Sequence, residues 1–315
     1  MKNVTMVPSI TPPMETARSR VTGKQTAARS CPICLSTQIS KKREQYVRGK
    51  IEYQFQQCRE CLIEFVVPMV SAEAEHYGDK EWYGERWEYR SCLAVTGLSG
   101  ARILEIGCGE GHFAQIAEHS NNHTIGLDFN SAAIDRARQR VPRQTFIRAD
   151  IKQIAQTSQH YGPFDMVAAF HVIEHLENIL GFSRHCVSLL RAGGFFVLAT
   201  PSQRRPTAAL GLHEWWDTPP HHLTRWQEQS FAALAIQNKL RIQNIIYQDF
   251  DAEQLQQALR NKIYKICFSY FGNRTVLYQF TKLLAWPMHY GLRILQNRRG
   301  IFTGKSVMVV AKKIE

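Results

Sequence analysis

The sequence lacks long uncharged hydrophobic runs and is comparatively poor in acidic residues. It has no uninterrupted apolar stretch of about 18 residues, so we expect no transmembrane helix. Residues 1–29 contain no apolar segment of the kind that opens a secretory signal, which predicts a cytoplasmic protein. The same residues mix Ser, Thr, Pro and basic side chains without periodicity, and we expect a disordered tail.

The shortage of acidic residues gives a net charge of +12, because 27 Asp and Glu stand against 39 Lys and Arg. Most of the excess lies in the last third of the chain, where residues 251–303 interleave basic, aliphatic and aromatic side chains. A basic amphipathic helical insertion of this kind can lie in a membrane interface. We therefore predict peripheral association with the cytoplasmic face of a membrane through residues 260–299. The alternatives are helices that cover a sheet edge or a homodimer contact.

Eight cysteines are present, and four of them form two Cys-x-x-Cys pairs. Without an export signal they indicate metal ligands or free thiols in a reducing compartment, not disulfides. The pairs are Cys31 with Cys34 and Cys58 with Cys61, and two such knuckles complete a tetrahedral shell for zinc. We predict a small zinc ribbon over residues 30–67. Its role is structural, because four cysteines leave no open coordination position.

A glycine-rich turn follows an apolar run, Arg102–Ile106, and precedes a helix-like segment, His112–Glu118. It reads Glu-Ile-Gly-Cys-Gly-Glu-Gly, beginning at Glu105, with alternate glycines at Gly107, Gly109 and Gly111. Glycines there let backbone N–H groups approach a ligand closely. The dinucleotide-binding pattern would need a further glycine at position 112, where the chain has histidine.

The spacing Glu-x-Gly-x-Gly-x-Gly resembles the first motif of class I S-adenosylmethionine-dependent methyltransferases. The resemblance implies an α/β fold, a Rossmann-like seven-stranded sheet over residues 100–315. It also implies that Glu105 and Gly107 hold the methionine ammonium group of the cofactor. The zinc ribbon and an aromatic helical linker, residues 68–99, resemble the front end of many bacterial methyltransferases that modify sugars or small molecules.

Alternating strands and helices follow the turn, as expected for a parallel sheet. The predicted strands are His123–Asp128, Thr145–Arg148, Phe164–Phe170, 195–200, 240–250 and an antiparallel last strand at 305–312. Asp128 ends the second strand and can accept both ribose hydroxyls. The resemblance places Asp150 and Ile151 against the adenine. For Asp150 a helix N-cap is an alternative.

The fourth strand leads into His171-Val-Ile-Glu-His175. His-x-x-Glu-His alone is a zinc-protease pattern, but here it directly leaves a strand, which argues against a protease. The segment resembles the corresponding motif of quinone-biosynthesis O-methyltransferases, where two carboxylates and a histidine can surround a divalent cation. Glu174 and His175 match, whereas His171 replaces the first carboxylate. We expect His171 over the cofactor and His175 in catalysis. Alternatively, Glu174 and His175 only cap the next helix.

A long loop, residues 201–226, leaves the carboxyl edge of the predicted sheet and is termed the lid loop here. Loops of this length in compact domains are usually functional. Its Pro-Pro-His-His segment resembles the lid of the same methyltransferase group, and its prolines could hold His221 or His222 over the site. We predict His222, with His175, as the catalytic base. Alternatively, the tryptophans pack the loop down and its histidines are solvated.

These features predict a methyltransferase that uses S-adenosylmethionine and a structural zinc ion. The expected acceptor is a small molecule, a sugar or a lipid-linked saccharide, with O-methylation favoured. An RNA methyltransferase is the alternative, since a zinc ribbon and a basic C-terminal third would suit a phosphate backbone. A third possibility is a scaffold that keeps the fold without catalysis.

Overall fold

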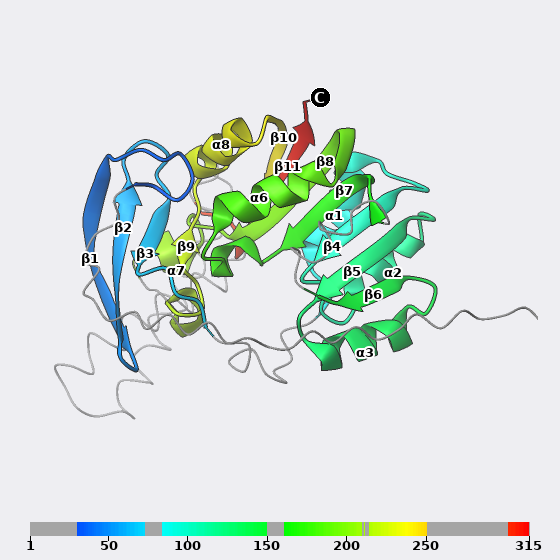
Figure 1. Ribbon diagram of the computed structural model, residues 1–315, viewed down its shortest axis with the longest axis horizontal. Helices are drawn as coiled ribbons and strands as arrows, with labels where there is room; N and C mark the ends of the chain where they lie inside the picture. The colour runs from blue at the N-terminus through cyan, green and yellow to red at the C-terminus, as the bar shows by residue number, and fades with distance from the viewer. Residues whose placement is uncertain are drawn as a thin grey trace, which may run out of the picture.

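The computed structural model describes residues 30–72, 84–149, 161–209, 211, 214–250 and 302–314. Two sheets carry the fold, a four-stranded sheet and a seven-stranded sheet, which lie beside each other in Figure 1. The predicted tail (1–29), part of the aromatic linker (73–83) and nearly all of the basic insertion (251–301) lie outside the described residues. Within the described part of the chain, no helix is long and apolar enough to cross a membrane.

The seven-stranded sheet has the order β10-β11-β8-β7-β4-β5-β6. Its strands are β4 (Arg102–Ile106), β5 (His123–Asp128), β6 (Thr145–Arg148), β7 (Phe164–Phe170), β8 (Leu190–Pro201), β10 (Leu240–Tyr247) and β11 (Ser306–Lys313). Strands β4 to β8 pair in parallel, whereas β11 runs antiparallel between β8 and β10. The predicted Rossmann-like sheet with an antiparallel last strand is therefore confirmed.

Helices cover both faces of this sheet. Among the described residues these helices are α1 (Trp87–Thr96), α2 (His112–Glu118), α3 (Ser131–Arg140), α6 (Ile179–Ser188) and α8 (Glu228–Gln237). The four-residue α7 (Pro206–Ala209) lies in the lid loop. Helices α1 and α2 share one buried cluster with the sheet, and α6 and α8 share another. Strand β7 is consequently buried on both sides: Val167, Ala168 and Ala169 are all fully buried. A strand covered on both faces needs no polar–apolar alternation, which explains its unbroken apolar run from Met166 to Phe170.

The small sheet has the order β1-β2-β3-β9 and is antiparallel throughout. It consists of β1 (Ile39–Arg48), β2 (Ile51–Cys58), β3 (Glu64–Val67) and β9 (Thr224–Arg225). The first three strands form the predicted ribbon, but β9 comes from the lid loop. The ribbon sheet is thus completed by a segment that lies far along the chain from its other three strands (Figure 1).

The ribbon also shares its core with the larger domain. Ser230 Oγ, on α8, donates a hydrogen bond of 2.9 Å to the carbonyl of Cys61. The Trp226 and Phe231 rings stack with centroids 5.0 Å apart, and both belong to the buried cluster that contains the ribbon cysteines. The ribbon is therefore fixed against the base of the lid loop by shared apolar contacts.

The predicted start of the fifth strand, residue 195, is wrong. Strand β8 already begins at Leu190 and contains Gly193 and Gly194. Gly193 has φ +71°, and a Cβ at Gly194 would meet the Asp165 carbonyl oxygen at 3.2 Å. The two glycines therefore allow β8 to begin irregularly and close to β7, at the point where the register between β7 and β8 shifts.

Candidate functional site

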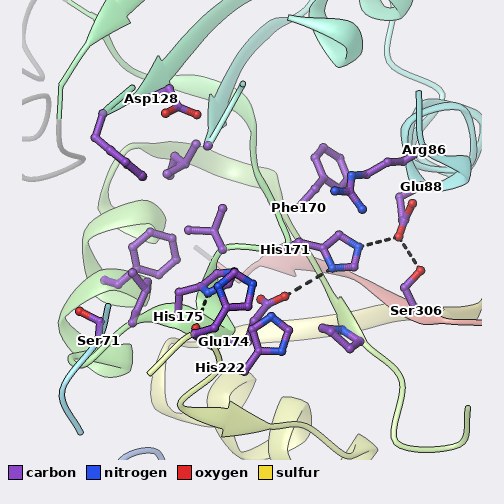
Figure 2. Close-up of a pocket in the computed structure, with 18 of the residues that line it drawn as sticks. Ser71, Arg86, Glu88, Asp128, Phe170, His171, Glu174, His175, His222 and Ser306 are labelled. Carbon is purple, nitrogen blue, oxygen red and sulfur yellow. Dashed lines mark hydrogen bonds and ion pairs between the residues drawn. The ribbon is translucent and has the colours of Figure 1, made fainter. Parts of the chain in front are cut away.

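A cavity of about 1030 Å³ opens at the carboxyl edge of the seven-stranded sheet (Figure 2). Its wall includes Gly107, Asp128, His171, His175 and His222. Parallel strands place their carboxyl ends at one edge, so residues far apart in the chain meet there. The volume is at the upper end of the range of small-molecule pockets, about 300–1,000 Å³.

The glycine-rich turn forms one part of the wall. Gly107, Gly109 and Gly111 have φ values of +73°, +50° and +78°, which residues other than glycine rarely adopt. A Cβ at Gly107 would lie 2.6 Å from Val172 Cγ2. The turn therefore combines unusual backbone angles with a close approach that only glycine permits. Gly107 lines the cavity, whereas Gly109 and Gly111 belong to the turn but not to the cavity wall.

Asp128 is held in place beside this turn. The Gly109 N–H donates to Asp128 Oδ2 and the Asn130 N–H to Oδ1, both at 2.9 Å. Burial raises the pKa of Asp128, and these backbone hydrogen bonds counteract part of that shift. The carboxylate lines the cavity in a fixed orientation, as an acceptor for ribose hydroxyls would.

Glu105 lies beneath the turn and does not line the cavity. It is 1% exposed, and its Oε2 has no hydrogen-bond partner among the described residues. Burial, and secondarily the charge of Asp128, raises the pKa of Glu105 well above its ordinary value. A buried carboxyl oxygen without a donor is costly, and a cationic group bound above the turn would relieve that cost. Glu105 and Gly107 therefore fit the ammonium end of S-adenosylmethionine.

Phe129 is a cavity residue that the sequence analysis missed. Its side chain is 50% exposed although it is large and apolar, and it follows Asp128 directly on the cavity wall. An exposed ring at this place can stack on a planar heterocycle such as adenine. The other predicted adenine contacts, Asp150 and Ile151, lie outside the described residues.

His171 connects the end of β7 to two carboxylates. Its Nε2 lies 3.0 Å from Glu88 Oε1 and its Nδ1 lies 3.4 Å from Glu174 Oε1, as Figure 2 shows. Ser306 Oγ also donates to Glu88, at 2.6 Å. Burial by itself lowers the pKa of His171, but the two carboxylates outweigh it and the pKa is raised. The helix α1, which carries Glu88, is thereby tied to the end of β7.

The two histidines predicted for catalysis meet in the structure, and a third joins them. The rings of His175, His221 and His222 have centroids 4.7 to 4.8 Å apart. His175 Nδ1 donates to the carbonyl of His221 at 2.6 Å, and His222 Nδ1 lies 3.1 Å from Asp217 Oδ1. Because a carbonyl and a carboxylate are acceptors, each Nδ1 carries a proton, and in the neutral form of each ring Nε2 is the acceptor atom.

Two alternatives from the sequence are contradicted by this arrangement. The lid histidines are not both solvated, since His222 is only 4% exposed. Glu174 and His175 do not cap the next helix: they lie in a 3₁₀ turn, Ile173–His175, and the side chain of Asn178 caps α6. The 3₁₀ turn also removes the protease interpretation, which needs His171 and His175 on one face of a regular helix.

Glu174 lies under the histidine cluster and is fully buried. Burial raises its pKa, but the imidazole of His171 and the nearby His175 and His222 outweigh burial and lower the pKa to about 2. The pKa of His175 is itself lowered to about 4, first by burial and then by the charge of His222. Glu174 is therefore ionised and His175 is neutral at neutral pH.

A buried ionic network within the lid loop was not predicted from the sequence. The Arg205 guanidinium donates to Asp217 Oδ2, and Arg225 Nε lies 3.6 Å from the same oxygen. Arg225 reaches into the ribbon, where its Nη1 lies 2.8 Å from Glu44 Oε2 and its guanidinium lies 4.0 Å from the centre of the Phe55 ring. The partners of Asp217 lie in the same loop, but no regular spacing relates them, because the irregular path of the loop brings them together.

The four predicted zinc ligands come together at one end of the ribbon. The Sγ atoms of Cys31 and Cys61 are 3.5 Å apart, as are those of Cys34 and Cys58, and all four lie within 4.8 Å of one another. A tetrahedral zinc site with Zn–S bonds of about 2.3 Å has sulfurs about 3.8 Å apart. The Ile33 N–H also points to Cys31 Sγ at 3.4 Å. The cluster therefore fits a zinc ion.

The strand order, the glycine turn and the placed acidic residue define a Rossmann-like fold of the class I methyltransferase type. A family model described as a methyltransferase domain matches residues 84–245, about half of the chain. The chain therefore belongs to this methyltransferase family.

Curated relatives agree with this assignment. The chain is 33% identical over 105 residues to a protein of Mycolicibacterium smegmatis named probable S-adenosylmethionine-dependent methyltransferase, covering 33% of this chain and 40% of that protein. It is 26% identical over 137 residues to the ubiquinone biosynthesis O-methyltransferase of Marinobacter nauticus, covering 38% and 57%. The matches thus span about half the length of these relatives. A solved S-adenosylmethionine-dependent methyltransferase from Archaeoglobus fulgidus is 17% identical, with a TM-score of 0.47 over 76% of this chain and all of that one.

Proposed function

We propose that the protein transfers the methyl group of S-adenosylmethionine to a hydroxyl oxygen of a small molecule, a sugar or a lipid-linked saccharide. The observation that carries this proposal is that residues suited to the cofactor and residues suited to proton transfer line the same cavity. Gly107 and Asp128 line it on the side suited to the cofactor, and His175 and His222 line it on the side of the lid loop. The likeness to a relative named for ubiquinone O-methylation supports oxygen as the acceptor atom.

In this proposal the chain mainly holds and orients the reactants. The cofactor supplies a methyl group already activated by its sulfonium charge. Gly107 and Glu105 would hold its methionine end, Asp128 its ribose and Phe129 its adenine. Alignment of an acceptor oxygen with the methyl carbon would then supply most of the rate enhancement.

The acceptor hydroxyl must lose its proton during transfer, and the histidine cluster is suited to assist. His175 and His222 both donate from Nδ1 to fixed oxygens, so each has Nε2 as its acceptor atom. An imidazole nitrogen held in this way can accept a proton. If His175→Ala and His222→Ala both kept full turnover with saturating cofactor, the histidines would have no part in proton removal. His123→Ala, at an exposed position on β5, is the matched control.

We further propose that the four ribbon cysteines hold a structural zinc ion. The support is the distances between their sulfurs and the pairing of β3 with β9, which joins the ribbon to the lid loop. In this arrangement the ion shapes the substrate side of the cavity without meeting the substrate.

The acceptor is identified by transfer of a tritiated methyl group from S-adenosylmethionine into cell extract, fractionated into RNA, lipid, polysaccharide and small molecules. We expect label in one of the last three fractions, and label in RNA would overturn the acceptor class. Calorimetry with S-adenosylhomocysteine is the companion measurement. No binding at high micromolar ligand would contradict a catalytic role and favour a scaffold.

A further inference from the structure

We infer that His175, His221 and His222 form a second metal site, in the cavity wall, for one divalent transition-metal ion such as Zn²⁺ or Fe²⁺. The ligand atoms of the three side chains lie within 4.8 Å of one another. Three imidazoles bound to one ion at about 2.0–2.1 Å have nitrogens about 3.3 Å apart, so closure requires shifts of about 1.5 Å or less. Small rotations of side chains in a loop can supply shifts of this size.

The outer partners of the histidines support the inference independently. A histidine that binds a metal almost always donates its other ring N–H to a carboxylate, a backbone carbonyl or water. His222 faces the carboxylate of Asp217 and His175 donates to the carbonyl of His221, so both occur here. Asp217 is in turn held by Arg205. Both rings are therefore oriented through Nδ1, which is the arrangement that a ligand binding through Nε2 requires.

Charge around the cluster also suits a cation. Glu174 is fully buried and directly precedes His175 in the chain. Its carboxylate oxygens accept no well-formed hydrogen bond among the described residues, although His171 Nδ1 faces one of them at 3.4 Å. Buried carboxylate oxygens with so few donors are stabilised by a positive ion nearby.

The ligand set differs from the one that the sequence motif suggested. That motif placed His171, Glu174 and His175 around a cation, but both ring nitrogens of His171 face carboxylates. Instead, His175 meets two histidines of the lid loop, whose position depends on the ribbon sheet. The proposed site therefore exists only when the lid loop lies against the end of β7.

The function of the site rests on the proposed methyl transfer and changes one step of it. Three protein ligands leave an open position, which the acceptor hydroxyl oxygen would occupy. With the hydroxyl bound there, its pKa would be lowered and its proton would pass to water. The oxygen then forms a bond to the methyl carbon, the carbon–sulfur bond breaks, and its electron pair stays on sulfur in neutral S-adenosylhomocysteine. His175 and His222 would then act as ligands and not as the base.

The test is cobalt binding to the full chain after the ribbon has been loaded with zinc. We expect one further Co²⁺ per chain, with visible absorption typical of nitrogen and oxygen ligands and no thiolate charge-transfer band. His221→Ala and His222→Ala should weaken this binding at least about tenfold, and Asp217→Asn by about 10- to 100-fold. His123→Ala should leave it unchanged. S-adenosylhomocysteine binding by each variant shows that the fold is intact.

No further cobalt, cobalt with a thiolate band, or binding unaffected by the His221 and His222 variants would each overturn the site. The result is separable from that for the proposed function. If S-adenosylhomocysteine binds and cobalt does not, methyl transfer stands without the metal. If cobalt binds and S-adenosylhomocysteine does not, the site stands and methyl transfer fails.

Discussion

The Oδ1 atom of Asp217 lies 3.1 Å from Nδ1 of His222. Both residues belong to the lid loop, and both side chains are buried. The other carboxylate oxygen of Asp217 faces Arg205 and Arg225. Arg225 belongs to β9, the strand that the lid loop adds to the ribbon sheet. One continuous set of polar contacts therefore runs from the ribbon to the histidine cluster.

Removing Arg225 should destabilise the protein strongly. It is fully buried and lies near three carboxylates, those of Asp217, Glu44 and Glu64. Loss of one partner from a buried ionic network leaves uncompensated charge and costs about 3–5 kcal/mol. We expect Arg225→Ala to lower the free energy of unfolding in urea by this amount. Arg241→Ala, at an exposed position on β10, should change it by less than about 0.5 kcal/mol. Equal effects would contradict the network.

Removing the ribbon zinc should loosen the lid loop as well as the ribbon. We expect Cys58→Ser to lower the bound zinc by one equivalent and to speed amide hydrogen exchange over residues 217–226, because β9 pairs only with β3 among the described strands. Strand β7 should keep its protection. Cys186→Ser, at a buried thiol of α6 outside the cluster, is the control for the loss of a sulfur. Unchanged exchange over the lid loop would show that its position does not depend on zinc.

Gly107→Ala should weaken binding of S-adenosylhomocysteine by about tenfold or more. The added Cβ would lie 2.6 Å from Val172 Cγ2, so the turn must move, and a displacement costing about 1.4 kcal/mol in binding is already tenfold. Gly97→Ala provides a matched control, since Gly97 has φ +63° but open space around it. Both variants should lose about 1–2 kcal/mol of stability from the left-handed backbone, and only the first should lose affinity in calorimetry.

The ion pair between His171 and Glu88 should make stability depend on pH. The folded pKa of His171 is raised above 6.5, so its contribution is complete below about pH 6.5 and is lost as the pH rises through the folded value. The folded pKa of Glu88 is lowered below 4.5, so its contribution is present above about pH 4.5 and is lost as the pH falls through the folded value. The pair stabilises most between these limits.

We therefore expect the difference in Tm between the protein and His171→Asn to be largest near about pH 5.5 and to shrink towards about pH 9. Asparagine is chosen because His171 has φ +56°, which asparagine tolerates better than most residues. A difference in Tm that does not change with pH would show that His171 contributes by packing alone.

Local pattern was sufficient for most of the fold. Strands β5, β6 and β7 begin and end where the sequence predicts, because each has a short apolar centre flanked by polar or turn residues. The predicted start of β8 was wrong because a contact across the sheet sets it: Gly194 lies against the backbone of β7. The ribbon was predicted from cysteine spacing, but β9 was not, because a two-residue strand has no sequence pattern of its own.

The sequence by itself determined the glycine turn, the acidic residue after the second strand and the four-cysteine cluster, since each depends on residue types at short, fixed spacings. Only the tertiary structure decided the histidine cluster. His175 follows β7, whereas His221 and His222 lie in the lid loop, and backbone contacts between the two segments bring the rings together. Glu88 likewise meets His171 only through the packing of α1. Burial and charge pairing between distant segments are set by packing, which spacing along the chain does not encode.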